Sequence, residues 1–115
     1  MIFIIDDDEI MAKCIKKAIN DEVRIFSNAI EAMAEISENN IPEIIFLDIL
    51  LNGPDGFTFL NELMSYEDTM KIPVVIVSSL NINNKDLSEY GVVGILNKDT
   101  MTPNDIRYYV NEYAK

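Results

Sequence analysis

The stretch Ile2-Phe3-Ile4-Ile5-Asp6-Asp7-Asp8 shows the pattern that decides the fold: a short apolar run that ends abruptly in carboxylates. Its four apolar residues are consecutive and do not alternate with polar ones. Such a run is typical of a strand buried on both faces, as in a parallel sheet covered by helices. Further runs occur at 44–47, 74–77 and 92–96, with a weaker one at 23–26. The sequence therefore predicts five buried strands.

Helical patterns separate these runs. The pairs Ile10/Met11, Cys14/Ile15 and Ala18/Ile19 recur at three and four residues, which predicts an amphipathic helix with Cys14 in the core. We expect further helices over 29–38, 56–65 and 84–90. Their inward side chains would include Met33 in the first of them and Leu60, Leu63 and Met64 in the second.

The last helix has the clearest start. Thr102 is placed as its N-cap, Pro103 as its first residue and Asp105 in its first turn. One stripe of this helix carries Ile106, Tyr109, Val110 and Tyr113, which we interpret as packing residues.

Regular alternation of strands and helices predicts an α/β fold, a doubly wound five-stranded parallel sheet with helices on both faces. The chain has 115 residues, the size of one domain, so we expect a single unit over 1–115. In such a sheet the ligand site lies at the carboxyl ends of the strands.

Composition narrows the function. Nine Lys and Arg against 20 Asp and Glu give a net charge of −11, which would repel nucleic acid. The apolar runs are too short to insert into a membrane, and the early carboxylates do not fit a signal peptide, so we expect a cytoplasmic protein. With no histidine and only Cys14, any metal should be held by oxygen.

Chemically active side chains stand at the carboxyl ends of four predicted strands. Because these ends meet at one edge of the sheet, we expect the side chains to converge. Crowded carboxylates raise one another's pKa, and a divalent cation would relieve this; oxygen ligands of this kind suit Mg²⁺. The residues are Asp6, Asp7 and Asp8 after the first strand, Asp48 after the third, Ser78 and Ser79 after the fourth, and Lys98 after the fifth.

This set indicates phosphoryl transfer, with Asp48 as the attacking carboxylate and with Lys98 and the Ser78 hydroxyl facing the anionic ligand. Asp8 is better interpreted as a helix N-cap. The residues leave open whether the metal pair is Asp6/Asp7 or Asp7/Asp8.

Over essentially its whole length, the chain resembles the receiver domains of two-component response regulators. No one motif is specific, but their order is. The motifs are Phe3-Ile4-Ile5-Asp6-Asp7, Ile45-Phe46-Leu47-Asp48 followed by Asp55-Gly56, Ile72-Pro73-Val74-Val75-Ile76-Val77-Ser78-Ser79, and Gly94-Ile95-Leu96-Asn97-Lys98.

The resemblance implies a flavodoxin-like sheet in the order 2-1-3-4-5 and a role for each site residue. Asp48 would accept a phosphoryl group from a sensor histidine kinase or a histidine phosphotransfer protein. The chain would then be a phosphoacceptor that assists its own phosphorylation and dephosphorylation, and not an enzyme with turnover. By position, Asp7, Asp48 and the Leu50 backbone carbonyl would bind Mg²⁺ directly, and Asp6 would contact it mainly through water. Ser78 would be the switch hydroxyl, and Lys98 would bind a phosphoryl oxygen. Ser79 would supply a small side chain that leaves room for the phosphoryl group.

Three positions depart from the family's pattern. Asp99 follows the lysine where proline is usual, Asn52 replaces a proline after the acceptor, and Ile95 replaces the aromatic switch residue. Ile95 and Asp99 favour an alternative, a pseudo-receiver that binds partners without phosphorylation. A less favoured alternative, from the Asp6-x-Asp8 spacing, is an aspartyl-phosphate hydrolase of the haloacid dehalogenase type; Ile10 stands where that family needs Thr or Val.

The last helix ends near residue 115, so we expect no output domain within the chain. The signal would pass to a downstream protein target, or to an output domain if the chain is a piece of a longer protein. Homodimerisation on phosphorylation stays open.

Overall fold

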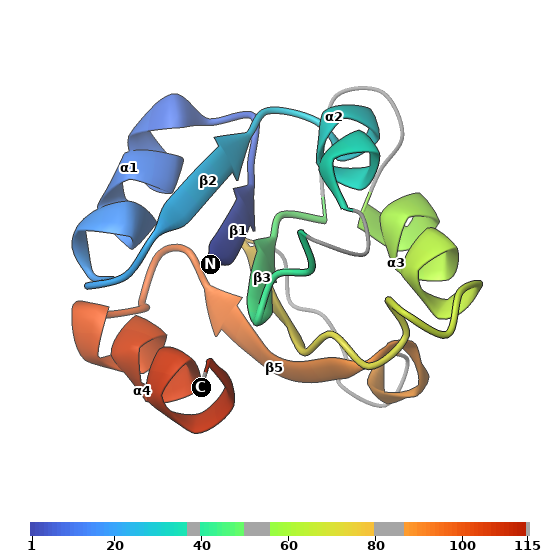
Figure 1. Ribbon diagram of the computed structural model, residues 1–115. Coiled ribbons are helices and arrows are strands. Elements are labelled where there is room, and N and C mark those ends of the chain that lie inside the picture. The colour runs from blue at the N-terminus through green and yellow to red at the C-terminus, as the bar shows by residue number, and fades with distance from the viewer. Residues whose placement is uncertain (37–39, 50–55, 80–86, 115) are drawn as a thin grey trace.

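The sheet is parallel and its strands follow the predicted order. The computed structural model describes residues 1–36, 40–49, 56–79 and 87–114. Within these ranges the order is β2-β1-β3-β4-β5, so the predicted 2-1-3-4-5 arrangement is confirmed (Figure 1). The strands are β1 (Ile2–Ile5), β2 (Val23–Phe26), β3 (Ile44–Leu47), β4 (Val74–Ser78) and β5 (Val92–Asn97).

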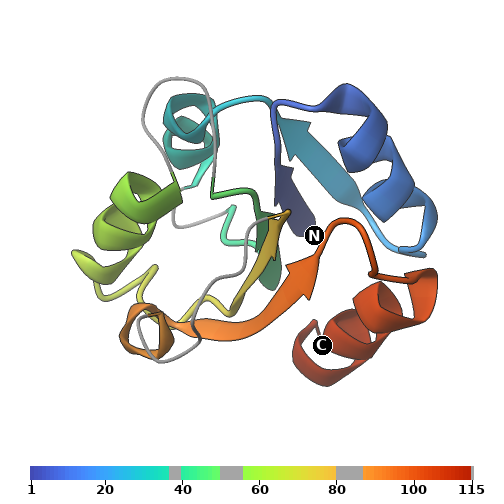
Figure 2. The ribbon, with the colours of Figure 1, turned by 180° about the vertical axis from the view of Figure 1, so that it is seen from behind.

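Helices cover both faces of this sheet, as the two opposite views show (Figures 1 and 2). One face carries α1 (Glu9–Lys17) and α4 (Pro103–Tyr113). The other carries α2 (Ala29–Glu35) and α3 (Gly56–Met64), with the short 3₁₀ helix η2 (Ser88–Tyr90) beside α3. The architecture is therefore three-layered, with β1, β3 and β4 buried throughout.

Three predicted helices differ in extent from the structure. The helix expected over 56–65 ends one residue earlier, at Met64. The helix expected over 29–38 ends at Glu35, where Ile36 leaves the helical conformation. Of the helix expected over 84–90, the structure describes only η2, and residues 80–86 lie outside the described part.

The core has two halves because successive strand residues point to opposite faces. Phe3 and Ile5 of β1 pack toward α2 and α3, whereas Ile2 and Ile4 pack toward α1 and α4. Leu60 and Leu63 are buried as predicted, and Met33 and Met64 are half-buried.

The prediction that Cys14 lies in the core is wrong, because its side chain is exposed. The buried stripe of α1 runs through Ala12 and Ile15 and continues to Ile19. At about 100° per residue, Ile10 and Cys14 lie on the opposite side of the helix. The apolar pattern fits two faces of α1, and the structure buries the one that carries Ala12.

The last helix begins as predicted, but Tyr113 of its predicted packing stripe is exposed. Thr102 is the N-cap and forms a capping box with Asp105, and Pro103 is the first helical residue. Ile106 is buried, and the Tyr109 ring lies where a side chain on Gly94 of β5 would otherwise be. The absence of a Cβ at residue 94 therefore lets α4 pack directly on β5.

Within the described ranges, no helix has the length and apolar character needed to cross a membrane.

Candidate functional site

The carboxyl ends of the strands bring the predicted site residues together through backbone hydrogen bonds. The Asp6 N–H donates to Phe26 O at 3.0 Å, and the Asp48 N–H donates to Ile5 O at 2.9 Å. On the other side, the Lys98 N–H donates to Ser78 O at 3.0 Å. Asp6, Asp48 and Lys98 are thus each the first residue beyond a strand, and Ser78 is the last residue of one; each is held by the neighbouring strand.

Lys98, which follows β5, forms ion pairs with the carboxylates that follow β1 and β3. Its Nζ lies 3.1 Å from Asp6 Oδ2 and donates a hydrogen bond to Asp48 Oδ2 at 3.0 Å. Only 14% of the Lys98 side chain is exposed, and the two carboxylates are nearly buried. Removal from water strengthens such ion pairs, so Lys98 is a structural counter-ion as well as a candidate ligand for an anion.

Three carboxylates form a compact oxygen cluster. One oxygen from each of Asp6, Asp7 and Asp48 lies within 4.8 Å of the others. Asp6 Oδ1 accepts a hydrogen bond from the Asp8 N–H at 2.9 Å, and its buried Oδ2 is ion-paired with Lys98 Nζ at 3.1 Å. Three carboxylate oxygens this close together fit a hard divalent cation such as Mg²⁺.

The electrostatics of the cluster show competing effects. Burial raises the pKa of Asp6 above its ordinary value, and the Asp48 charge adds to the rise, although the Asp8 N–H and Lys98 act against it. Burial lowers the pKa of Lys98, but the hydrogen bonds and charges of Asp48 and Asp6 outweigh this and leave it raised. Metal-free, the site therefore disfavours the charged form of Asp6 and stabilises charged Lys98.

Asp8 has a separate structural role. It is the N-cap of α1, and its side chain accepts hydrogen bonds from the Ile10 and Met11 N–H groups at 3.0 and 3.3 Å. The prediction that Asp8 is a cap is confirmed. The three clustered carboxylates are those of Asp6, Asp7 and Asp48, without Asp8.

The remaining predicted residues lie at the same edge or outside the described part. Ser78 is the buried last residue of β4, and Ser79 next to it is exposed. Ile95 is half-buried and packs against the core on the α2 and α3 side. Leu50, whose carbonyl the resemblance assigns to the metal, lies outside the described residues, as do Asn52, Gly53, Pro54 and Asp55.

Asn97 is a positioning residue that the motif reading did not single out. Its side-chain Oδ1 accepts the Asp99 N–H at 2.8 Å, and its carbonyl accepts the Met101 N–H at 2.8 Å. These bonds form the turn after Lys98, where the family usually has proline. The signal was available in the sequence, because Asn side chains commonly bond the backbone two residues on.

Comparison with known proteins agrees with this geometry. A protein-glutamate methylesterase/protein-glutamine glutaminase of Pseudomonas savastanoi pv. phaseolicola is 31% identical over 108 residues, covering 86% of this chain and 29% of that protein. The phosphorylated cyanobacterial phytochrome response regulator RcpA matches with a TM-score of 0.73 and 26% identity, covering 96% of this chain and 88% of RcpA. The Mn²⁺-bound response regulator Rcp1 matches with a TM-score of 0.72 and 25% identity, with the same coverage.

The chain spans less than a third of the length of the curated relatives that it matches. The sequence model of the response regulator receiver domain matches residues 2–111. The chain therefore belongs to the response regulator receiver domain family, the proteins of two-component signalling.

Proposed function

We propose that the chain is a phosphoacceptor switch in which Asp48 takes a phosphoryl group from a phosphohistidine of a sensor histidine kinase or histidine phosphotransfer protein. The observation that carries this proposal is the Lys98 ammonium, which lies within 3.1 Å of both Asp6 and Asp48 at the strand ends. Structures of the similar regulators RcpA and Rcp1, one phosphorylated and one Mn²⁺-bound, support the same chemistry here.

The proposed step is a simple displacement at phosphorus. A carboxylate oxygen of Asp48 forms the new bond to phosphorus, and the bond from phosphorus to the imidazole nitrogen breaks with its electron pair on that nitrogen. Asp48 is held at the end of β3 by the hydrogen bond from its N–H to Ile5 O, so the carboxylate stays at the site edge. Lys98 would hold one oxygen of the transferred group, and the Ser78 hydroxyl would approach another.

The residues present fit a metal ion. Asp6, Asp7 and Asp48 would hold Mg²⁺, with the Leu50 carbonyl as a further ligand by family position. When bound, Mg²⁺ would neutralise charge that develops on the phosphoryl oxygens. The chain's own contribution is to bury Asp6, to orient it through the Asp8 N–H, and to balance the cluster with Lys98.

Phosphorylation would then move Lys98 from the carboxylate pair to the phosphoryl group. Because the Lys98 N–H is bonded to Ser78 O, the ends of β4 and β5 should respond together. The change would be read by a downstream protein target or by an output domain elsewhere in a longer protein. Ile95 replaces the family's aromatic switch, so the response should follow backbone and Lys98 movement and not the swing of a ring.

The experiment is phosphorylation by acetyl phosphate with Mg²⁺, followed by intact-mass measurement. We expect one added phosphoryl group in the parent and none in Asp48→Asn or with EDTA. Asp21→Asn serves as a matched control, because exposed Asp21 precedes β2 at the opposite edge of the sheet. A phosphoryl group that persists in Asp48→Asn would disprove the proposal, and unphosphorylated parent would favour a phosphorylation-independent module.

A further inference from the structure

A groove lies between α2 and α3, on the face of the sheet away from α1 and α4. It consists of two adjoining cavities of about 310 and 320 Å³, and both are lined by Met33 of α2 and Glu62 of α3. One cavity extends along α2 to Ile30, and the other extends to Ile41 and Asp68. The two cavities therefore adjoin at Met33 and Glu62, and we refer to them together as the groove between α2 and α3.

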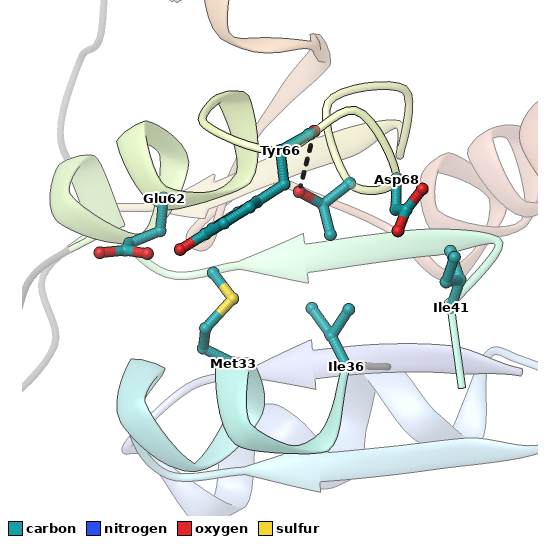
Figure 3. Close-up of a pocket in the computed structure, with 7 residues that line it drawn as sticks. Met33, Ile36, Ile41, Glu62, Tyr66 and Asp68 are labelled. Atoms are coloured by element: carbon teal, nitrogen blue, oxygen red, sulfur yellow. Dashed lines mark hydrogen bonds between the residues drawn. The ribbon is translucent and has the colours of Figure 1, made fainter. Parts of the chain in front are cut away.

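The walls of the groove are apolar and open to solvent. Figure 3 shows Met33 and Ile36 on the α2 side facing the ring of Tyr66 across the groove. Ile30 is 64% exposed, Tyr66 57% and Ile41 38%. Contiguous large apolar side chains left in water at one place typically mark a binding surface, whereas singly exposed ones do not.

Charge along the groove has one sign. In Figure 3 the Glu62 and Asp68 carboxylates lie on opposite sides of Tyr66, along the same side of the groove. The sequence contains no lysine or arginine between Arg24 and Lys71, but it contains nine Asp and Glu residues there. Arg24 at the border is already ion-paired with Glu35 at 2.9 Å. Residues 25–70 thus contain no lysine or arginine that could neutralise the carboxylates of the groove.

We propose that the groove between α2 and α3 binds an amphipathic helical segment of a partner protein, with apolar side chains in the two cavities and lysine or arginine beside Glu62 and Asp68. Amphipathic helices bind in apolar grooves by placing side chains at three- and four-residue spacing into neighbouring hollows. The acidic rim specifies a basic partner. A second copy of this chain fits poorly, because each copy has a net charge of −11.

This surface is separate from the phosphoryl-transfer chemistry, so the proposal stands without it. The groove residues named here lie on α2, on α3 and in the segments that follow these helices, and none of them belongs to the Asp6, Asp7, Asp48 and Lys98 cluster. Binding should therefore be present in the unphosphorylated chain and in Asp48→Asn.

The test uses a fluorescein-labelled synthetic helix of leucine and lysine, roughly 18 residues or five turns long, with leucines at three- and four-residue spacing. Fluorescence anisotropy would measure its affinity for the whole chain. We expect saturable binding that weakens with salt, and at least about tenfold weaker binding to Ile30→Glu, which places a charge in the apolar groove. Glu62→Gln should weaken binding about two- to fivefold.

Matched variants separate groove binding from bulk attraction between opposite charges. Ile10→Glu makes the same change at a 76% exposed isoleucine on α1, and should alter the affinity less than about twofold. Ile30→Ser removes the apolar side chain without adding charge, and should still weaken binding. A twin peptide with glutamate in place of lysine should not bind.

Several results would overturn the proposal. They are equal weakening by Ile10→Glu and Ile30→Glu, equal binding of the glutamate peptide, or no saturable binding of the lysine peptide. Light scattering adds one more: a parent dimer that Ile30→Glu separates would assign the groove to a second copy. Amide chemical-shift changes confined to α2 and α3 on adding the lysine peptide would support the proposal.

Discussion

At the scale of single residues, the acidic run Asp6-Asp7-Asp8 divides into two roles. Asp8 caps α1 through the Ile10 and Met11 N–H groups, while Asp6 and Asp7 face Asp48. Asp8→Asn should keep the cap, because asparagine is an equally good N-cap, and should still be phosphorylated with Mg²⁺. Asp7→Asn should lose most of its Mg²⁺-dependent phosphorylation, measured as intact mass across a Mg²⁺ titration. Loss of Mg²⁺-dependent phosphorylation in Asp8→Asn as well as in Asp7→Asn would make Asp7/Asp8 the metal pair.

Asp6 also predicts a pH dependence of stability. Burial raises its pKa in the folded state above the ordinary value of 3.8, so folding disfavours the carboxylate. The folded chain then binds the proton more tightly than the unfolded one, and this cost is present above the raised pKa and disappears as pH falls toward 3.8. In EDTA, Asp6→Asn should therefore have the larger free energy of unfolding at neutral pH, and this advantage should shrink in acid.

Urea unfolding at several pH values would measure the difference between Asp6→Asn and the parent. Asp21→Asn is the control for loss of a surface carboxylate, and its difference from the parent should show no such advantage at neutral pH. A destabilised Asp6→Asn at neutral pH would mean that the ion pair with Lys98 outweighs burial.

At the scale of elements, α4 is fixed to the sheet by contact between Tyr109 and Gly94. A Cβ at residue 94 would collide with the Tyr109 ring and hydroxyl, so Gly94→Ala should destabilise the chain by about 1–3 kcal/mol. Truncation by Tyr109→Ala would remove the collision. In urea unfolding, the cost of Gly94→Ala should therefore be much smaller in the Tyr109→Ala background than in the parent.

Gly91 provides the control for this cycle. Its φ is 76°, in the left-handed region, so Gly91→Ala should cost about 1–2 kcal/mol through the backbone alone. That cost should be the same with or without Tyr109. Equal costs of Gly94→Ala in both backgrounds would show that Tyr109 does not press on residue 94.

The elements also show where sequence reasoning succeeds. Strands β1, β3 and β4 were predictable because consecutive apolar residues suit burial on both faces. The start of α4 was predictable because Thr102, Pro103 and Asp105 act within one turn. The buried side of α1 was not, because Ile10/Cys14 and Ala12/Ile15 each form an apolar pair at helical spacing. Packing against the sheet, which depends on distant residues, decides between them.

At the scale of the whole molecule, the site was more predictable than its surroundings. Parallel strands end at one edge, so their last residues had to meet, and Asp6, Asp48 and Lys98 do. The groove between α2 and α3 has no such rule. It depends on how Met33 of α2 and Tyr66 of the segment after α3, which are far apart in the chain, leave space between them. Periodicity describes the buried side of each helix, but not the gap between two helices.

Added salt should stabilise the whole molecule in two ways, by screening its net charge and, for Mg²⁺, by binding at the site. A net charge of −11 implies self-repulsion, which NaCl screens, so NaCl should raise the melting temperature of the parent and of Asp48→Asn by similar amounts. Mg²⁺ at the same ionic strength should add a further rise in the parent, about 2.7 kcal/mol when its concentration is 100 times its Kd. For a domain of this size, each kcal/mol of added stability raises the melting temperature by roughly 3 to 6 °C.

Asp48→Asn isolates the part of the Mg²⁺ effect that belongs to the site. The variant removes one of three clustered carboxylates but changes the net charge by only one, so screening by either salt stays nearly the same. The extra rise with Mg²⁺ should therefore disappear in Asp48→Asn and persist in Asp21→Asn, measured by thermal melts at matched ionic strength. If all three proteins gain equally from Mg²⁺, the ion acts on the acidic surface as a whole, and the cluster of Asp6, Asp7 and Asp48 is not a metal site.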